Sequence, residues 1–325
     1  ISGYNLEIGI TTDIEATIKE EGEIVVSAKL FLDIVRRLPE EIVFIETDER
    51  MVTYIACGKV NYQIVGMSSV EYPDLPSFEQ TDRITLNAKI LRDMIRQTVY
   101  AVSENTAKPI YTGSLYEIED GVFKIIAIDG YRMAIRSENV DSESKNRFVV
   151  PGKTQHEVLK LLTDDEENTE IIIGQRHITF KIKNYRIISR LIEGTFIEYK
   201  SAIPKETKTE VVINTRTIID AVERMSLLNN DRIQSPVRCI FSDDEIKLSC
   251  TSAVGRANDV ISVPIIGESV EIGFNNRYLL DALKNADTDE IKLILNGSLT
   301  AMIVKPVKGD SYLSIVVPMR LANEN

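Results

Sequence analysis

Tryptophan is absent from this 325-residue sequence, and cysteine and histidine occur only three times and twice. Cys57, Cys239 and Cys250 are odd in number and form no CxxC pair. This argues against a disulfide framework or a zinc site and favours a reducing, cytosolic compartment, with the cysteines as small core residues. No apolar run approaches the roughly 18 residues that cross a bilayer, so the sequence predicts a protein that is not embedded in a membrane.

Catalytic motifs are missing as well. There is no GxxxxGK[ST] phosphate loop, no HExxH zinc helix and no GxSxG nucleophile elbow. His156 and His177 stand in a helix pattern and a strand pattern, where a surface imidazole is the ordinary expectation. The acidic run 164–167 is typical of a solvated loop, because a cation site needs spaced ligands. We therefore expect no catalytic residues, no metal site and no cofactor.

Basic residues are outnumbered, with 38 Lys and Arg against 50 Asp and Glu, a net charge of −12. Spread evenly, this charge would argue against a nucleic-acid partner, because phosphate binding normally requires a basic surface. The length is typical of two or three domains. The 43% of hydrophobic residues excludes a disordered chain.

A pattern of about sixty residues repeats five times. Each copy opens with a tripeptide that ends in a basic residue, at positions 29, 89, 153, 216 and 277. Four of the five open with Asn or Ser, which are good N-cap residues and predict the start of a helix; Pro151 is the exception. Counting the basic residue as zero, apolar side chains recur at +2, +5, +6 and +9, the spacing of one buried helix face, and only Thr98 and Gln155 break the rule.

The opposite face of each predicted helix is also patterned. Position +4 is acidic in all five copies, and position +7 is basic in all except Glu223. Positions 0, +4 and +7 share one helix face. The five helices together carry a net charge of +6, which leaves −18 for the rest of the chain. One such helix is ordinary on a soluble surface, but five in phase need an explanation.

Strand-like runs separate the helices, for example 41–46, 170–173, 177–182, 245–250 and 291–295. The sequence thus predicts an α+β fold of repeated helix-plus-antiparallel-sheet units, two per domain. The predicted domains are 1–82, 83–203 and 204–325. The first domain holds only one helical unit, so we expect about forty further residues ahead of Ile1 in a complete domain, judged from the repeat length.

Six motifs stand in order along the chain: 102–105 (VSEN), 127–134 (AIDGYRMA), 149–153 (VVPGK), 190–196 (RLIEGTF), 273–275 (GFN) and 316–321 (VVPMRL). In these motifs, and over essentially its whole length, the chain resembles the bacterial sliding clamps, the beta subunits of DNA polymerase III. The resemblance implies a DNA clamp fold with an N-terminally truncated first domain. It also implies a head-to-tail homodimeric ring in the cytoplasm, associated with the nucleoid. Such a protein is the non-catalytic processivity subunit of a DNA-directed DNA polymerase, a nucleotidyltransferase.

The family arrangement would explain the charge pattern. Helices would line a central hole and meet the phosphates of double-stranded DNA without reading its sequence, while the acidic exterior would repel DNA elsewhere. The encircled duplex could not leave sideways, which would give processivity. The residues implied to face DNA are Lys29, Arg36, Lys89, Arg92, Arg96, Lys153, Lys160, Arg216, Arg277 and Lys284.

The resemblance also implies a peptide-binding cleft between the second and third domains. It would take short motifs of the polymerase alpha subunit, the clamp loader, other polymerases and repair proteins. The matching residues are Tyr111, Ile128, Gly130, Tyr131, Arg132, Met133, Ile197, Ala202, Asn275, Tyr278, Leu299, Ala301, Ile315, Val317, Pro318, Met319 and Arg320. Ile128 and Ile197 replace a frequent threonine and proline of the family. For the dimer interface, the resemblance implies Tyr62, Ile64, Leu227, Leu228 and Ile233.

Two alternatives remain open at this point. The chain could be a repeat-built scaffold that binds peptides without encircling DNA, or an enzyme with a non-standard site. Retention on circular against linear DNA separates the clamp from the scaffold, and nucleotide turnover by the purified chain would indicate an enzyme.

Overall fold

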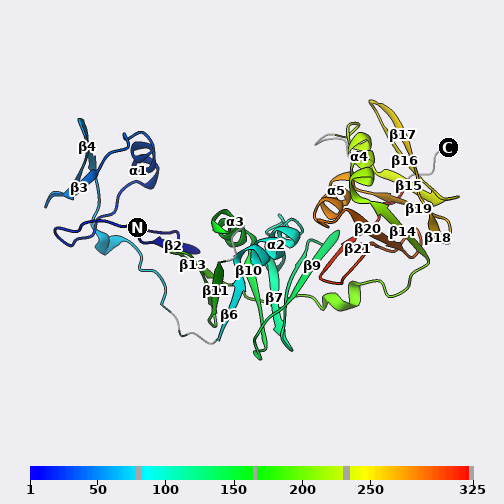
Figure 1. The fold of residues 1–325 in the computed structure, drawn as a ribbon, viewed down its shortest axis with the longest axis horizontal. Coiled ribbons are helices and arrows are strands. Elements are labelled where there is room, and N and C mark those ends of the chain that lie inside the picture. The colour runs from blue at the N-terminus through cyan, green and yellow to red at the C-terminus, as the bar shows by residue number, and fades with distance from the viewer. Residues whose placement is uncertain (78, 80–81, 164–166, 230–234, 322–325) are drawn as a thin grey trace. The chain divides into compact units, whose positions relative to one another are not determined.

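The structure is a computed structural model, and it describes residues 1–77, 79, 82–163, 167–229 and 235–321. The chain divides into two units, Ile1–Ser77 (unit 1) and Phe78–Asn325 (unit 2) (Figure 1). Among the described residues, no helix is both long enough and apolar enough to cross a bilayer. Nor does this part of the chain contain a cluster of three His, Cys, Asp or Glu side chains that could hold a metal ion.

Five α-helices begin where the repeated tripeptides predict them: α1 Ala28–Val35, α2 Ala88–Val99, α3 Gly152–Leu161, α4 Thr215–Ser226 and α5 Asn276–Lys284. Four of them have the expected N-cap, because the side chains of Ser27, Asn87, Asn214 and Asn275 accept backbone N–H groups of the first turn. Pro151 supplies no such cap to α3. The predicted helix starts are therefore confirmed.

Unit 2 contains the repeat four times. The first two copies comprise β6 Asp82–Asn87, η2 Pro109–Thr112, β7 Gly113–Glu119, β8 Val122–Ile128, β9 Arg132–Asn139, β10 Asn146–Pro151, β11 Asn168–Ile173, β12 His177–Ile182 and β13 Tyr185–Arg190, with α2 and α3. After η3 Tyr199–Ala202, the next two comprise β14 Thr209–Asn214, β15 Val237–Ser242, β16 Glu245–Ser252, β17 Gly255–Ser262, β18 Ile265–Gly267, β19 Val270–Phe274, β20 Glu290–Leu295, β21 Met302–Pro306 and β22 Tyr312–Val316, with α4 and α5.

The copies come in pairs because they exchange strands. The strand before α2, β6, pairs with β11 after α3, while β10 before α3 pairs with β7 after α2. The second pair repeats this exchange, with β14 on β20 and β19 on β15. Equivalent backbone hydrogen bonds recur, from Ala88 N to Glu167 O and from Thr215 N to Asp289 O, both 2.8 Å. A single copy would leave its first strand without a partner. Two successive copies therefore fold together as one unit.

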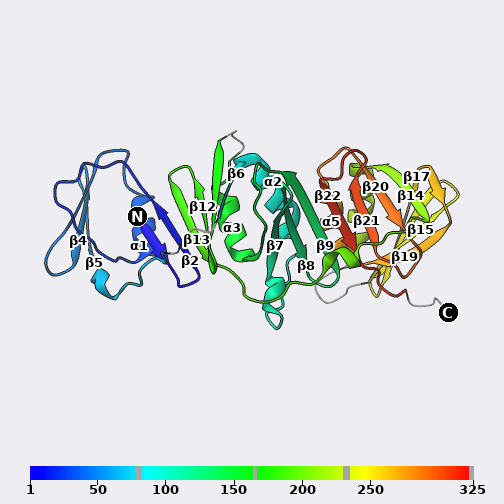
Figure 2. The ribbon, with the colours of Figure 1, turned by 90° about the horizontal axis from the view of Figure 1, so that it is seen from below.

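One sheet joins the two pairs of copies. Its nine strands follow the order β10-β7-β8-β9-β22-β21-β20-β14-β18, and Figure 2 shows β9 beside β22 at its centre. The register there sets Met133 opposite Ile315 and Ala134 opposite Ser314. Figure 1 shows the four helices of unit 2 on one side of this sheet. Residues 83–203 and 204–325 are thus connected by main-chain hydrogen bonds rather than by a flexible linker alone.

The predicted apolar helix faces form the core of unit 2. The two polar exceptions, Thr98 and Gln155, are fully buried, and each donates hydrogen bonds, although Gln155 Oε1 has no partner among the described residues. Thr98 Oγ1 donates to Met94 O at 2.8 Å, and Gln155 Nε2 donates to Val150 O at 2.9 Å. Cys57, Cys239 and Cys250 are buried and free, as expected.

Unit 1 contains β1 Ser2–Tyr4, β2 Ile8–Thr12, β3 Val43–Thr47, β4 Val52–Cys57, β5 Val60–Val65 and η1 Ser69–Glu71, with α1. Its buried core consists of Ile34, Ile55 and Ile64. The predicted burial of Val35 at position +6 is wrong, since this side chain is 43% exposed. At the same position, Ile95 and Val222 are fully buried, because α2 packs against α3 and α4 against α5. In residues 1–77, all of which are described, α1 has no second α-helix beside it.

Candidate functional site

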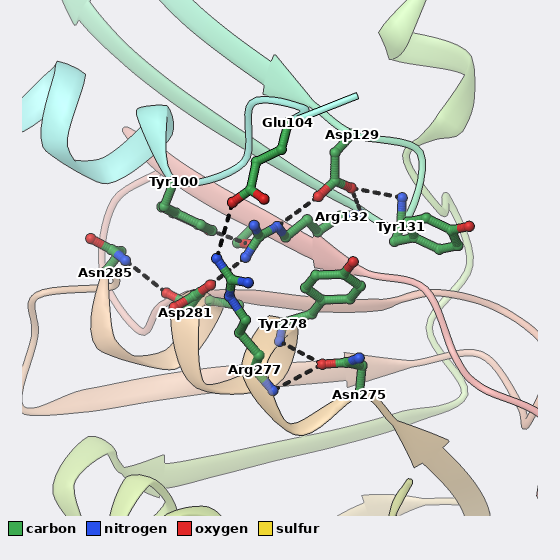
Figure 3. Close-up of polar contacts among 12 residues, drawn as sticks. Tyr100, Glu104, Asp129, Tyr131, Arg132, Asn275, Arg277, Tyr278, Asp281 and Asn285 are labelled. Carbon is green, nitrogen blue, oxygen red and sulfur yellow. Dashed lines mark hydrogen bonds and ion pairs between the residues drawn. The ribbon is translucent and has the colours of Figure 1, made fainter. Parts of the chain in front are cut away.

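Residues predicted for the peptide-binding cleft meet where β9 and β22 pair, next to the start of α5 (Figure 3). Arg132 lies at the centre of this junction and is only 6% exposed. Its Nε donates to Asp129 Oδ2 at 2.9 Å, and its Nη1 bonds to Asp281 of α5. A guanidinium removed from water must be paired, so these two carboxylates account for its burial.

Two aromatic rings enclose the same guanidinium. The Arg132 Cζ atom lies 5.4 Å from the centre of the Tyr100 ring and 4.6 Å from that of Tyr278. Cation–π contacts of this kind strengthen when the groups are desolvated. Arg132 of β9 thus contacts both Tyr100, at the C-terminal end of α2, and Tyr278 and Asp281 of α5.

Tyr131, the neighbouring residue, faces outward instead and is 60% exposed. Its ring stacks on that of Tyr278, with the centroids 5.8 Å apart and the planes inclined by 18° (Figure 3). The backbone of Tyr131 is held from both sides, since its N–H donates to Asp129 Oδ1 at 2.8 Å and its carbonyl accepts from Val317 N at 2.9 Å. The pair of rings therefore forms a fixed aromatic surface at the junction.

Beneath the junction lies a buried hydroxyl cluster. Tyr100 Oη is 3.0 Å from Tyr312 Oη and 2.8 Å from Ser314 Oγ. Burial raises the pKa of Tyr100 to about 12 and the pKa of Tyr312 well above its usual value. Both phenols therefore stay protonated and remain hydrogen-bond donors at neutral pH.

An apolar cluster continues from this junction under the outer surface. Met133 and Ile315 are buried members of it, and Tyr111, Ile128 and Ala301 pack against it while only half-buried. Four other predicted residues are exposed apolar side chains, namely Tyr131, Ile197, Leu299 and Val317, and Val317 is bonded to Tyr131 through the main chain. The structure thus brings five predicted residues from both halves of unit 2 into or against one apolar cluster.

The remaining predicted cleft residues have varied positions. Gly130 is exposed with a φ of +94°, a conformation that favours glycine. Asn275 accepts from Arg277 N and Tyr278 N as the N-cap of α5, and Met319 N donates to Gly273 O at 2.8 Å. Ala202 and Arg320 are exposed, and Pro318 is half-buried. A cavity of about 390 Å³ lies beside the turn 191–196, and none of the predicted cleft residues lines it.

Several residues of the junction escaped the sequence analysis. Asp129 belongs to the 127–134 motif, and Asp281 is the acidic residue at position +4 of the fifth helix. Neither pattern indicates that these two residues pair with Arg132. Tyr100, Tyr312 and Ser314 had none, because they meet Arg132 or one another only across the fold.

The basic helix positions fall into two groups. Lys29, Lys89 and Lys153 are exposed, and no ion pair to them is found among the described residues. The others named here are engaged by carboxylates: Lys160 by Glu157, Arg216 by Asp220, Lys284 by Glu223, Arg277 by Glu104 and Arg96 by Asp93 and Asp287. Arg92 lies 3.5 Å from Asp93, and Arg36 is exposed. Glu223, the one acidic side chain at position +7, is thereby explained as the partner of Lys284 on α5, at 2.7 Å.

The residues expected at a dimer interface differ in their exposure to solvent. Tyr62 is partly exposed on β5, whereas Ile64 belongs to the core of unit 1. Leu227, after α4, is 82% exposed, and Leu228 packs against the core of unit 2. Ile233 lies outside the described residues.

Comparisons with known proteins cover the whole length of the chain. Sequence models of the DNA polymerase III beta subunit match residues 1–76 with its N-terminal domain, 85–198 with its central domain and 200–320 with its C-terminal domain. The beta sliding clamp of Halalkalibacterium halodurans is 34% identical over 322 residues, 97% of this chain and 84% of that protein. The beta sliding clamp of Bacillus subtilis is 32% identical over 309 residues, 94% of this chain and 82% of that protein.

Solved structures agree with these relatives. A DNA polymerase sliding clamp from Bacillus subtilis is similar with a TM-score of 0.95 and 31% identity, covering 99% of this chain and 88% of that one. A sliding clamp from Pseudomonas aeruginosa bound to griselimycin has a TM-score of 0.93 and 26% identity, covering 98% and 88%.

Proposed function

This chain belongs to the DNA polymerase III beta subunit family, the sliding clamps, and we propose that it encircles duplex DNA as a head-to-tail homodimer and tethers the replicative polymerase. It is the non-catalytic subunit in this role, so the polymerase chemistry belongs to its partner. Its proposed domains are 1–82, 83–203 and 204–325, and its proposed location is the cytoplasm, at the nucleoid.

One observation carries the DNA-binding role. The second residue of every α-helix is basic: Lys29, Lys89, Lys153, Arg216 and Arg277. None of the five described α-helices has an acidic residue in its first turn. Helix stability favours the opposite, because an anion near the N-terminus contributes about 0.3–1 kcal/mol and a cation opposes the dipole. Five cations kept at unfavourable positions in an acidic protein support a role in attracting an external anion.

The physics of that contact suits sliding. Amide groups at helix N-termini and nearby lysines attract phosphates regardless of base sequence. Several of the other cations form salt bridges within the protein, so the overall attraction to the phosphates stays weak. Weak contacts permit movement along the duplex, while the closed ring prevents escape.

Retention on DNA tests this function. The full chain is loaded by a clamp loader onto a nicked circular duplex, isolated by gel filtration, and the circle is then cut with a restriction enzyme. We expect the protein to stay on the circle and to leave after cutting. Equal retention on circular and linear DNA would indicate a scaffold that does not encircle DNA. Light scattering is a second check, since a strict monomer at micromolar concentration would contradict the ring.

The proposed ring contact places the partly exposed Tyr62 of one copy against the exposed Leu227 and the half-buried Leu228 of the other. A ring of this kind closes only through a heterologous contact between two different surfaces. Leu227→Asp should therefore shift the light-scattering mass toward a monomer, while Ile266→Asp, at an exposed position on β18, should leave it unchanged.

We further propose that the apolar surface at the β9–β22 junction takes short peptide motifs from the polymerase alpha subunit, the clamp loader, other polymerases and repair proteins. Its support is the buried apolar cluster built from both halves of unit 2 together with the exposed apolar side chains of Tyr131, Leu299 and Val317, because apolar surface is the usual character of a peptide groove. Griselimycin, bound by the Pseudomonas aeruginosa clamp, serves as a probe in isothermal titration. Leu299→Ala and Val317→Ala should each weaken it, and the control Ile266→Ala should not.

A further inference from the structure

The chain between the two halves of unit 2, residues 193–204, is here termed the strap. It follows β13, contains η3 and ends before β14. Two of its side chains, Phe196 and Tyr199, belong to the buried apolar cluster of the sheet, together with Leu115, Ile126, Met133, Val149, Ile303 and Ile315. The strap therefore packs on strands from both halves of unit 2, and it carries two of the proposed cleft residues, Ile197 and Ala202.

Side chains hold the strap in place. The chain is bonded to the sheet through main-chain groups just before it, from Ile192 N to Val149 O, and after it, from Lys208 N to Leu295 O. Within the strap, the hydrogen bond from Ser201 N to Glu198 O is local and spans 3.4 Å. A segment supported in this way depends on its buried side chains for a defined position.

The deepest polar support is a bond between Tyr199 and Glu117 of β7. The phenol Oη donates to Glu117 Oε1 at 2.8 Å, and the two residues are only 2% and 6% exposed. Burial, and next the Glu117 carboxylate, raise the pKa of Tyr199 above its ordinary value, so the phenol remains a donor. A hydrogen bond to a buried carboxylate is among the stronger ones in proteins.

Two cations complete this support. Arg147 Nε lies 3.9 Å from Glu117 Oε2, and Lys200 Nζ of the strap lies 4.0 Å from Oε1. Arg147 also reaches the strap, donating from Nη2 to Ile197 O at 3.5 Å and lying 3.9 Å from Glu198. The carboxylate of Glu117 is thus surrounded by a phenol and two cations, two of these three groups belonging to the strap.

We propose that Glu117 is a positioning residue for peptide binding: through Tyr199 it fixes the strap, and through the strap it sets the wall of the cleft formed by Ile197 and Ala202. The inference rests on the proposed peptide-binding function. Glu117 is only 6% exposed and is bonded to Tyr199 of the strap, so its proposed role is to position the strap rather than to contact the peptide. Loss of its bond to Tyr199 leaves the apolar cluster intact but frees the strap to move, so a ligand must order it again on binding.

The test uses the full chain and the variant Tyr199→Phe, which removes one hydroxyl and keeps the ring in the cluster. Amide hydrogen exchange measured by mass spectrometry should accelerate by about tenfold at the hydrogen-bonded amides of the strap and its ends, those of Ile192, Ser201 and Lys208, the effect of losing one hydrogen bond to a charged group. In isothermal titration the affinity for griselimycin should fall by about three- to tenfold for the same reason. Glu117→Gln, whose amide oxygen still accepts from the phenol, should lie between Tyr199→Phe and the wild type in both measurements.

Tyr116→Phe is the matched control. Tyr116 precedes Glu117 on β7 and is fully buried, and its hydroxyl has no hydrogen-bond partner among the described residues. Removing that hydroxyl should change neither strap exchange nor griselimycin affinity. Both variants delete one hydroxyl from a buried tyrosine, but only Tyr199→Phe loses a hydrogen bond, so an effect of the missing atom alone would appear in both.

The outcomes separate the two levels of the proposal. Unchanged strap exchange in Tyr199→Phe would overturn the anchor, and faster exchange with unchanged affinity would overturn its connection to the cleft. Equal effects of Tyr116→Phe and Tyr199→Phe would mean that Glu117 contributes only to core packing and does not position the strap. A wild-type chain that does not bind griselimycin would overturn the peptide cleft itself and with it the positioning role, whatever the exchange rates show.

Discussion

Arg132 of β9 makes a cation–π contact with Tyr278 of α5, its Cζ atom lying 4.6 Å from the ring centre. The two residues belong to different halves of unit 2, and Asp281, one turn along α5 from Tyr278, bonds to the same guanidinium. Arg132 lies on a central strand of the nine-stranded sheet, and the exposed Tyr131 ring stacks on Tyr278. The contact therefore connects the centre of the sheet with the Tyr131 ring. The proposed peptide-binding surface and the junction of the two halves therefore share one set of side chains.

The first prediction concerns this junction. Arg132→Met keeps the aliphatic stem but leaves Asp129 and Asp281 without their common cation. Breaking a buried pair on one side costs several kcal/mol; because Asp281 is 31% exposed, we expect the free energy of unfolding to fall by about 2–4 kcal/mol. Urea unfolding followed by circular dichroism measures it.

Arg277→Met is the control for that measurement. Arg277 pairs with Glu104 at 3.3 Å, and both side chains are largely exposed, so its loss should change the free energy of unfolding by less than about 1 kcal/mol. Equal losses in the two variants would contradict a special role of the Arg132 junction.

The second prediction concerns the lysines at the helix starts. Replacing Lys29, Lys89 and Lys153 with alanine should weaken binding to a short DNA duplex. It should also reduce the slope of log K against log salt by about 1 for each phosphate that the protein no longer neutralises. Fluorescence anisotropy over a series of NaCl concentrations measures both effects.

A matched triple variant removes the same charge elsewhere. Lys59, Lys205 and Lys308 are exposed and lie outside the helices, so alanine at these positions gives the same net charge. We expect its salt slope to equal that of the wild type. An equal reduction of the slope in the two triple variants would mean that total charge, rather than placement on the helices, governs the interaction with DNA.

The third prediction is a pH dependence at Glu170 of β11. Hydrogen bonds from Lys181 and Arg83, each 2.6 Å long, hold the pKa of Glu170 below its usual 4.5. The unfolded chain therefore takes up the proton first as the pH falls. The stabilisation is complete above pH 4.5 and disappears as the pH falls through the lower, folded-state pKa.

Thermal unfolding of the wild type and Glu170→Gln tests this sign. The wild type should have the higher midpoint at about pH 6, and the two midpoints should converge toward about pH 3. A difference that stays constant over this range, or that grows as the pH falls, would contradict the effect of Lys181 and Arg83 on the carboxyl group.

The fourth prediction concerns His177 at the start of β12. Burial, followed by the positive charges of Arg190 and Arg176, lowers the pKa of its imidazole below 6.5. Its contribution to stability is therefore present above pH 6.5 and is lost as the pH falls through the folded-state pKa. An NMR titration should give a midpoint below 6.5, with the resonance assigned by its disappearance in His177→Gln. A midpoint above 6.5 would contradict the effect of burial.

Much of the fold follows from short-range patterns. Helix starts depend on one capping residue and on apolar side chains within ten positions, and strands on alternation over about six, so the five helices and the strands 177–182 and 291–295 were predictable. The burial of Thr98 and Gln155 was predictable from their place on the apolar face. Both side chains donate to main-chain carbonyls no more than five residues away, whereas the bond from Gln155 Nε2 to Ser114 Oγ, 41 positions away, was not predictable.

The functional surfaces were less predictable, because charge pattern and motif resemblance locate residues but not their partners. The sequence shows the basic helix face. It does not show which of these cations are paired in the fold: Lys284 forms an ion pair with Glu223 of another helix, whereas no ion pair to Lys89 is found among the described residues. Likewise the resemblance places Arg132 among the peptide-binding residues, but it does not indicate that Tyr100, Tyr278 and two carboxylates enclose its side chain.

Local chemistry in the chain was enough to specify the repeat, the helix caps, the segregated charge and the family. Packing alone established which side chains are available: the exposure of Val35, the enclosure of Arg132 by a residue 149 positions away, and the anchoring of the strap through Glu117 and Tyr199, 82 positions apart. The reason is physical. Periodicity and capping act within a few residues, whereas burial and the pairing of charges depend on which distant elements come together in three dimensions.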